Sequence, residues 1–298
     1  MAVTAAQQAA YISVVKGPFN VRPIELDPFR SGSPFSKHAI LDIKDLYAFA
    51  SLEVQTDLPI ERLGRVSFER NGKEFIGIDA IWFHKNDTKK NLPVMAKGVA
   101  NATKTRLVIP FADETLRTLA GIRRGELVHL EGELLTLKVA VKSKEEGDPD
   151  FPEFSAKARV VDYQPERFFQ QRYTQTSITQ TQTGEQAHEF PLVGANVRLR
   201  SMLLETQNDD ITHIAIRRDN EIIWESSVED LKFEMARFGD MKAPAKGVWL
   251  PFVETGFANE QAFIPVARNS LKLLITKRTP GEIDVYNDFI EIEQLPQL

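Results

Sequence analysis

The feature that most constrains this sequence is a pattern of apolar alternation and turns that occurs once in each half of the chain. Residues 66–75 read VSFERNGKEF, and residues 214–223 read IAIRRDNEII. Each stretch has an apolar alternation, an Arg, a two-residue turn signal and a second apolar stretch, and each leads to a Trp, Trp82 or Trp224. Alternation with a period of two is typical of half-buried strands, so each stretch predicts a β-hairpin.

Further elements repeat in the same order. Residues 107–111 (LVIPF) match residues 248–252 (VWLPF), and a polar loop or short helix follows each Pro-Phe pair. A long alternating strand comes next, and the last strand of each half ends near a proline, Pro165 or Pro296. Because several elements recur in one order, we infer that the chain is an internal duplication.

Other segments alternate in the same way and predict strands. The clearest places Leu135, Leu137, Val139 and Val141 on one face. Similar alternation occurs at Val66/Phe68, Ala156/Ala158/Val160, Ile214/Ile216, Leu271/Leu273/Ile275, Ile283/Val285 and Ile290/Ile292. Asn71-Gly72 and Asp219-Asn220 suit type I′ hairpin turns, and Pro280-Gly281 marks another tight turn. Together these signals predict an all-β, mostly antiparallel protein.

The chain length fits two domains of this kind. With 298 residues, each half has room for a β-sandwich of roughly 100 residues, the first enlarged by inserts at 85–104 and 143–153. We predict an N-terminal arm at 1–16, a first barrel at 17–167 and a second barrel at 189–298. Between them, residues 168–188 are rich in Thr and Gln and predict an exposed linker. The alternative is an extended arm that adds a strand to a neighbouring sheet.

Two short helices are predicted. In the first, Ser227 and Asp230 form a capping pair, and Val228, Leu231, Met235 and Phe238 make one apolar stripe that ends before Gly239 at the C′ position. The second covers residues 113–120. Stripes of this kind pack against a core more often than they bind a cofactor.

Composition excludes several classes of function. The chain has no Cys, so it has no disulfide, thiolate metal site or cysteine nucleophile. Its formal net charge is −5, whereas proteins that wrap nucleic acid carry an excess of Lys and Arg. We therefore expect no direct contact with nucleic acid. The absence of Cys also fits assembly in a reducing cytoplasm.

No segment predicts a membrane span, because none approaches about 18–20 apolar residues. The stretch from Met1 to Val15 lacks the basic start of a signal peptide, and Gln7, Gln8 and Tyr11 interrupt its apolar part. We interpret it as an arm or a short helix.

The sequence contains no pattern for catalysis or for a cofactor. Its histidines, His38, His84, His129, His188 and His213, are scattered without metal-binding spacing. It has no nucleophile elbow and no Gly-rich phosphate loop. We therefore predict no catalytic, cofactor-binding or metal-binding residues. Asp148 with Asp150, or Asp209 with Asp210, is a weak candidate for a structural calcium ion.

A basic cluster falls in the first insert and consists of Lys85, Lys89, Lys90, Lys97 and Lys104. It has no interleaved aromatic residues of the kind that stack on bases in nucleic-acid sites. We interpret it as a solvated loop, with lipid head groups as a weaker alternative.

The second half of the chain resembles a known family. Residues 212–216 (THIAI), Trp224, Asp230-Leu231, the alternation at Leu271/Leu273/Ile275 and a closing strand at 283–292 resemble the C-terminal barrel of the major capsid protein of corticoviruses, within residues 211–295. More loosely, they are similar to tectivirus and finnlakevirus capsid proteins. The resemblance implies a double jelly roll, with two tandem jelly-roll barrels and short helices.

The same resemblance implies a structural, non-enzymatic role as the major capsid protein of a tailless, membrane-containing icosahedral phage. Homotrimers would form pseudo-hexameric capsomers that contact neighbouring capsomers and vertex or minor capsid proteins. The arm at 1–16 would contact an inner lipid membrane, and the protein would assemble in the host cytoplasm and be located in the virion. The alternatives are a receptor- or carbohydrate-binding double-barrel module, such as a spike or minor capsid protein, and a cupin-like metalloenzyme.

Overall fold

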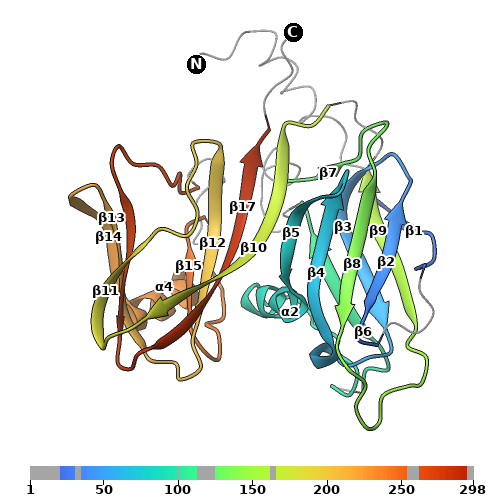
Figure 1. Ribbon diagram of the computed structural model, residues 1–298, viewed down its shortest axis with the longest axis horizontal. Helices are drawn as coiled ribbons and strands as arrows, with labels where there is room; N and C mark the ends of the chain where they lie inside the picture. The colour runs from blue at the N-terminus through green and yellow to red at the C-terminus, as the bar shows by residue number, and fades with distance from the viewer. Residues whose placement is uncertain are drawn as a thin grey trace. The chain divides into compact units, whose positions relative to one another are not determined.

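The alternating segments of the sequence form strands in the computed structural model, which describes residues 21–30, 35–99, 101–112, 125–161, 166–253 and 262–293. The chain divides into two units (Figure 1). Unit 1 runs up to His84 and also includes Pro93–Gln171 and the chain from Ile292 on, whereas unit 2 includes Lys85–Leu92 and Arg172–Glu291. The arm predicted at 1–16 and the helix predicted at 113–120 lie outside the described residues.

Unit 1 is built of two sheets. Its strands are β1 (Arg22–Glu25), β2 (His38–Ile43), β3 (Ala48–Thr56), β4 (Leu63–Arg70), β5 (Lys73–Asp79), β6 (Thr105–Pro110), β7 (Leu127–Val128), β8 (Leu135–Val141) and β9 (Phe154–Val161). One sheet has the order β1-β9-β3-β6, with the short β7 paired to β3. In the other sheet, β5-β4-β8-β2 are neighbours. The neighbouring strands of both sheets run antiparallel, as the sequence predicts.

Unit 2 is built in the same way. Its strands are most of β10 (Phe169–Gln180), β11 (Gly184–Glu189), β12 (Val197–Glu205), β13 (Ile211–Arg218), β14 (Glu221–Ser227), β15 (Val248–Pro251), β16 (Leu271–Lys277) and most of β17 (Gly281–Ile292). One sheet has neighbours in the order β15-β12-β17-β10, and the other has the order β11-β16-β13-β14.

The two units share one topology. When the strands of each unit are numbered from one to eight in chain order, leaving out β7, both units have sheets of order 1-8-3-6 and 2-7-4-5. Two four-stranded antiparallel sheets that exchange strands in this way form a jelly roll. The predicted all-β double jelly roll is therefore confirmed, and the duplication read from the sequence extends to every strand of these sheets.

Turn chemistry fixes the equivalent hairpin in each unit. Asn71 and Gly72 join β4 to β5 with φ values of 51° and 76°, which is the positive-φ pair that a type I′ turn requires. Between β13 and β14, Asp219 has a φ of 54°, whereas Asn220 is not in the positive-φ region, so this turn is not type I′. The carboxylate of Asp219 instead accepts hydrogen bonds from the N–H groups of Asn269 and Ser270, at 2.7 and 3.0 Å.

A helix follows this hairpin in each unit. In unit 2 it is α4 (Val228–Phe238), where the Ser227 hydroxyl accepts a hydrogen bond from the Asp230 N–H, so the predicted cap is confirmed. Two details of the prediction are wrong: Phe238 is exposed rather than part of the buried stripe, and Gly239 has an ordinary φ of −105°. The left-handed residue that ends the helix is Asp240, with a φ of 49°.

The helix after the first hairpin, α2 (Ala80–Lys89), was not predicted. The sequence analysis placed the second half of it in a solvated insert and treated Trp82 as the counterpart of Trp224. In the structure Trp82 lies on α2 and Trp224 lies on strand β14. Nearly every residue of α2 is at least partly buried, including polar ones such as Asn86 and Lys89, so its sequence has no clear apolar stripe.

The segment at 168–188 also differs from its prediction as an exposed linker. Residues 169–180 form β10 and residues 184–189 form β11, the first strand of each sheet of unit 2. The amide side chains of Gln170, Gln171 and Gln180 are buried, and Gln180 donates to the carbonyl of Gly184 at 2.8 Å. In this segment hydrogen-bonded glutamine side chains occupy buried positions that apolar side chains occupy in the other strands. The sequence of the segment therefore lacks the apolar alternation that predicts a strand.

The apolar core of unit 2 lies between its two sheets. It includes Leu199, Met202 and Leu204 of β12, together with Ile214, Ile216, Leu273, Ile275, Ile283 and Val285. In unit 1, Leu52 and Val54 of β3 and Leu107 and Ile109 of β6 are buried in the same alternating way. Each strand thus buries one face and leaves the other outside the sandwich.

One glycine of unit 2 cannot carry a side chain. Gly247 has a φ of 86°, and a Cβ there would lie 2.1 Å from the carbonyl oxygen of Leu204, whereas Gly72 has a similar φ and open space around it. We expect Gly72→Ala to lower the free energy of unfolding by about 1–2 kcal/mol, the cost of a left-handed residue. Gly247→Ala should cost clearly more, because backbone atoms must also move. Urea unfolding of both variants measures this, and equal losses would contradict it.

Candidate structural site: a buried ion-pair network

The histidines of the chain are not brought together in the structure. His38 begins β2, His84 lies on α2, His129 follows β7, His188 lies on β11 and His213 lies on β13. Among the described residues, no group of three or more His, Asp or Glu side chains could hold a metal ion. No helix in the described part of the chain is long and apolar enough to cross a membrane.

Buried histidines serve the packing of unit 1. The ring nitrogens of His129 face the backbone carbonyl oxygens of Asp45 and Glu133, at 2.8 and 3.0 Å. His84 faces the carbonyl of Arg106 at 3.0 Å. Burial lowers the pKa of His84, although this carbonyl acts in the opposite direction.

The acidic pairs considered for calcium have partners within the protein. Asp148 accepts hydrogen bonds from Arg62 at 2.8 Å and from the N–H of Glu145, and Asp150 pairs with Lys144. Asp209 accepts from the N–H of Gly247, and Asp210 pairs with Lys277 and Thr279. A calcium ion at either pair therefore stays a prediction, and it would compete with these contacts.

The basic cluster of the first insert is not a solvated loop as predicted. Lys85 and Lys89 lie on α2, within the part of the helix that belongs to unit 2. Lys85 contacts both carboxylate oxygens of Glu205, and the side chain of Lys89 is buried. Only the later members, such as Lys104 near Glu153, lie on the surface.

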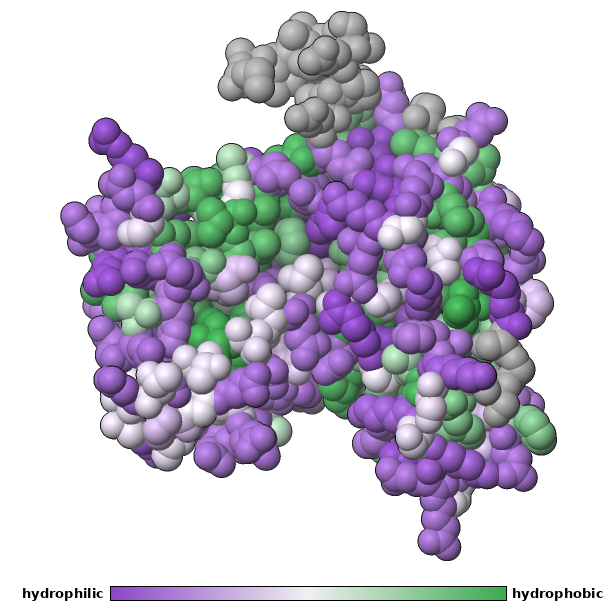
Figure 2. Space-filling view, viewed as in Figure 1, coloured by the Kyte–Doolittle hydropathy of each residue, from purple (hydrophilic) through white to green (hydrophobic). Residues whose placement is uncertain are grey.

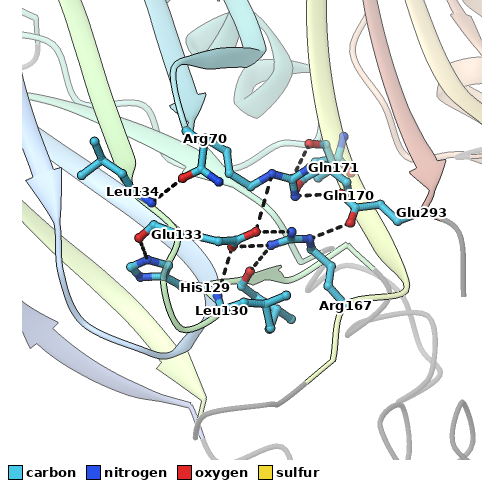
Figure 3. Close-up of polar contacts among 11 residues, drawn as sticks. Arg70, His129, Leu130, Glu133, Leu134, Arg167, Gln170, Gln171 and Glu293 are labelled. Carbon is cyan, nitrogen blue, oxygen red and sulfur yellow. Dashed lines mark hydrogen bonds and ion pairs between the residues drawn. The ribbon is translucent and has the colours of Figure 1, made fainter. Parts of the chain in front are cut away.

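A partly buried cluster of charged side chains lies at one end of unit 1 (Figure 3). Four residues from distant parts of the sequence form it. Arg70 ends β4, Glu133 lies between β7 and β8, Arg167 precedes β10, and Glu293 follows β17. The last two lie where the chain leaves unit 1 for unit 2 and where it returns.

Arg167 is the centre of this network. It contacts Glu133 in a bidentate manner, with nitrogen–oxygen distances of 2.7 and 2.9 Å, and its Nε lies 3.0 Å from Glu293. It also donates to the carbonyl of Val128 at 2.6 Å. Arg70 contacts the other oxygen of Glu293 at 2.7 Å and the amide oxygen of Gln170 at 3.1 Å. Planar guanidinium groups suit such bidentate contacts with carboxylates.

The charges of the network are largely shielded from solvent, and they shift the pKa values of Glu133 and Arg167. The side chains of Arg167 and Glu133 are only 4% and 14% exposed. Burial acts to raise the pKa of Glu133, but hydrogen bonds from Arg167 and the Leu130 N–H, with the charges of Arg167 and Arg70, outweigh it and hold the pKa below its ordinary value. In the same way, Glu133 and Glu293 outweigh burial and raise the pKa of Arg167. Each charged side chain of the network therefore has at least one partner of opposite charge.

Comparison with known proteins agrees with a structural role. Residues 23–161 match the model of the viral coat protein P2 N-terminal domain, and residues 170–293 match that of the viral coat protein P2 C-terminal domain. The chain belongs to the viral coat protein P2 family. No curated protein sequence matches it. The second match begins at residue 170, so it takes β10 into the second domain.

Solved structures of low sequence identity share the fold. The major capsid protein P2 of bacteriophage PM2 superposes with a TM-score of 0.77 at 10% identity, over 94% of this chain and 100% of that one. The STIV major capsid protein gives 0.68 at 9% identity, over 94% and 100%. The capsid protein of PBCV-1 virus gives 0.64 at 11% identity, over 92% and 94%.

Membership in the P2 family confirms the resemblance to a capsid protein that the sequence suggests. The chain is a structural, non-enzymatic component of a viral capsid. The cupin-like metalloenzyme considered as an alternative is therefore wrong for this coat protein.

The network of this coat protein predicts a large effect from one substitution. Arg167→Ala leaves the two partly buried carboxylates without the arginine that pairs with both, and because breaking a fully buried pair costs about 3–5 kcal/mol, we expect a loss of up to that size. A matched control is Arg65→Ala, whose pair with Glu74 has both side chains about 40% exposed and should change stability by at most about 1 kcal/mol. Urea unfolding of both variants measures the difference. Similar small losses in both would show that the network contributes little.

The lowered pKa of Glu133 predicts a pH dependence. The unfolded chain holds a proton on this residue below about pH 4.3, while the folded protein keeps the carboxylate to lower pH. The stabilisation is therefore present above that pH and is lost as the pH falls through the folded pKa. The free energy of unfolding of the wild type should exceed that of Glu133→Gln at pH 7, and the gap should narrow below about pH 4.3. A gap that stays constant from pH 7 to pH 3 would contradict this.

Proposed function

We propose that this coat protein is the major capsid protein of a tailless icosahedral phage and that three copies form a pseudo-hexameric capsomer. The observation that carries the proposal is the duplication itself. Two domains of one coat-protein family lie in tandem, and their sheets have the same strand order. Three such chains around one axis place six similar barrels in a ring, so a three-fold tile presents nearly six-fold edges.

The surface of the single chain has features that suit assembly. Figure 2 shows a face on which apolar patches interrupt a mostly hydrophilic surface. Large apolar side chains are exposed in both units, among them Val99, Phe151, Val193, Phe233 and Phe238. Where exposed apolar side chains form a contiguous patch, the patch marks an interaction site in soluble proteins. Contacts between copies would cover part of it.

The remaining partners follow from the same proposal. Capsomers would contact one another and vertex or minor capsid proteins within the virion, over an inner lipid membrane approached by the arm at 1–16. The net charge of −5 supports a shell that does not bind nucleic acid directly. Assembly would take place in the host cytoplasm, in keeping with a chain that has no Cys.

The proposal predicts the mass of the purified protein. Light scattering at two concentrations tenfold apart should give a trimer of the 33.7 kDa chain at both. Electron microscopy of the same sample should show pseudo-hexagonal tiles. A monomer at both concentrations would contradict the capsomer and would favour a receptor-binding module instead.

A further inference from the structure

The first turn residue of the equivalent hairpin makes the same pair of hydrogen bonds in both units. In unit 1 the N–H of Asn71 donates to the carbonyl of Leu134 at 2.9 Å, and the side-chain oxygen of Asn71 accepts from the Leu134 N–H at 2.8 Å. In unit 2 the N–H of Asp219 donates to the carbonyl of Ser270 at 2.7 Å, and its carboxylate accepts from the Ser270 N–H at 3.0 Å. Leu134 and Ser270 directly precede the equivalent strands β8 and β16. We call this pair of hydrogen bonds the turn lock.

The side chain that makes the turn lock differs between the units. In unit 1 it is the amide of Asn71, which Gly72 follows, and in unit 2 it is the carboxylate of Asp219, which Asn220 follows. The backbone geometry is nearly the same, with φ values of 51° for Asn71 and 54° for Asp219. The turn lock therefore accepts either an amide or a carboxylate. Asp219 shows the arrangement that Asn71 would have if its side chain lost the amide nitrogen and became a carboxylate.

The pair Asn71-Gly72 is the one Asn-Gly pair of the sequence. The peptide nitrogen that follows an Asn can attack the side-chain carbon Cγ of that Asn, and a Gly at the second position leaves the nitrogen accessible because it has no Cβ. Both residues of the pair are exposed, and no atom lies within 4 Å of the position that a Cβ of Gly72 would occupy. The attacking nitrogen is therefore unobstructed.

The folded turn also leaves the reacting groups of Asn71 available. Attack on Cγ places negative charge on the side-chain oxygen, and the Leu134 N–H already donates a hydrogen bond to that oxygen. Among the described residues, no group accepts a hydrogen bond from the N–H of Gly72 or from Nδ2 of Asn71. The nucleophile and the leaving group are thus both free, whereas the atom that gains charge is held by a donor.

We propose that Asn71 is a deamidation site of the folded protein and that its aspartate product keeps the turn lock. The nitrogen of Gly72 gives its proton to hydroxide and bonds to Cγ, the bond from Cγ to Nδ2 breaks, and ammonia leaves with a proton taken from water. Water then opens the cyclic imide to a carboxylate, so the chain gains one negative charge. Opening at Cγ gives aspartate and an unchanged main chain. Opening at the other carbonyl gives isoaspartate, whose longer main chain breaks the lock.

A second Asn of the chain provides an internal comparison. Asn269 is exposed and precedes Ser270, and this is the one Asn-Ser pair of the sequence. The N–H of Ser270, which would have to attack Asn269, donates instead to the carboxylate of Asp219 in the turn lock of unit 2. The same lock therefore blocks the nucleophile at Asn269 and leaves it free at Asn71.

Rates of deamidation in the native and the unfolded chain test the site. Native protein and protein unfolded in guanidinium are incubated at mildly alkaline pH, digested briefly with pepsin at acid pH and analysed by peptide mass spectrometry. Dividing the native rate by the unfolded rate removes the intrinsic difference between Gly and Ser. We expect this ratio to be at least about tenfold higher for Asn71 than for Asn269, because the Ser270 N–H must first leave a hydrogen bond to a carboxylate. Equal ratios, or a lower ratio for Asn71, would overturn the proposal.

Variants of the exposed turn test whether the product keeps the lock. Asn71→Asp makes the expected product directly, and its urea unfolding midpoint should stay close to that of the wild type. Asn71→Ala removes the side-chain acceptor and should lower the midpoint, because a left-handed alanine is also strained. Asp219→Asn is the matched exchange in unit 2 and should stay close to the wild type as well. An Asn71→Asp variant that loses as much as Asn71→Ala would refute the preserved lock. These outcomes do not depend on the number of copies in the capsomer.

Discussion

Burial of one face of every strand is the constraint on which the rest of this structure depends. Apolar side chains alternate along the strands, so each four-stranded sheet has one apolar face, and two sheets must close on each other to cover it. The core of unit 2 draws on both of its sheets. The inner faces of the two sheets pack against each other, so only their outer faces can make further contacts. In unit 2 one of them is covered by Lys89 and its helix.

Strands and turns could be predicted because their signals are local. Asn71-Gly72 supplies the two positive φ angles of a hairpin, and Ser227 supplies the cap of α4. Helix α2 could not be predicted, because a helix that is covered on nearly all sides has no exposed polar face. Its sequence therefore lacks the alternation of polar and apolar residues with a period of 3.6 that indicates a helix. The ammonium group of its buried Lys89 lies over the ring of Trp249 and donates a hydrogen bond to Ser201, and both partners are distant in sequence. Strand β10 was missed because buried glutamines replace apolar residues.

The ion-pair network could not be predicted for a related reason. Arg70, Glu133, Arg167 and Glu293 are each ordinary surface residue types, and only the folded topology brings them together. A charge shielded from solvent is destabilising unless it is paired with a charge of opposite sign, so the network forms only when all four chain segments come together. In contrast, duplication was evident in the sequence and led to the fold.

The central claim is that three copies of a duplicated coat protein place six similar barrels in one ring. An electron cryo-microscopy map of the purified oligomer at side-chain resolution tests it most directly. The account predicts three chains with six barrels in a ring. A map in which the oligomer is not three-fold, or in which the six barrels do not form one ring, would contradict it.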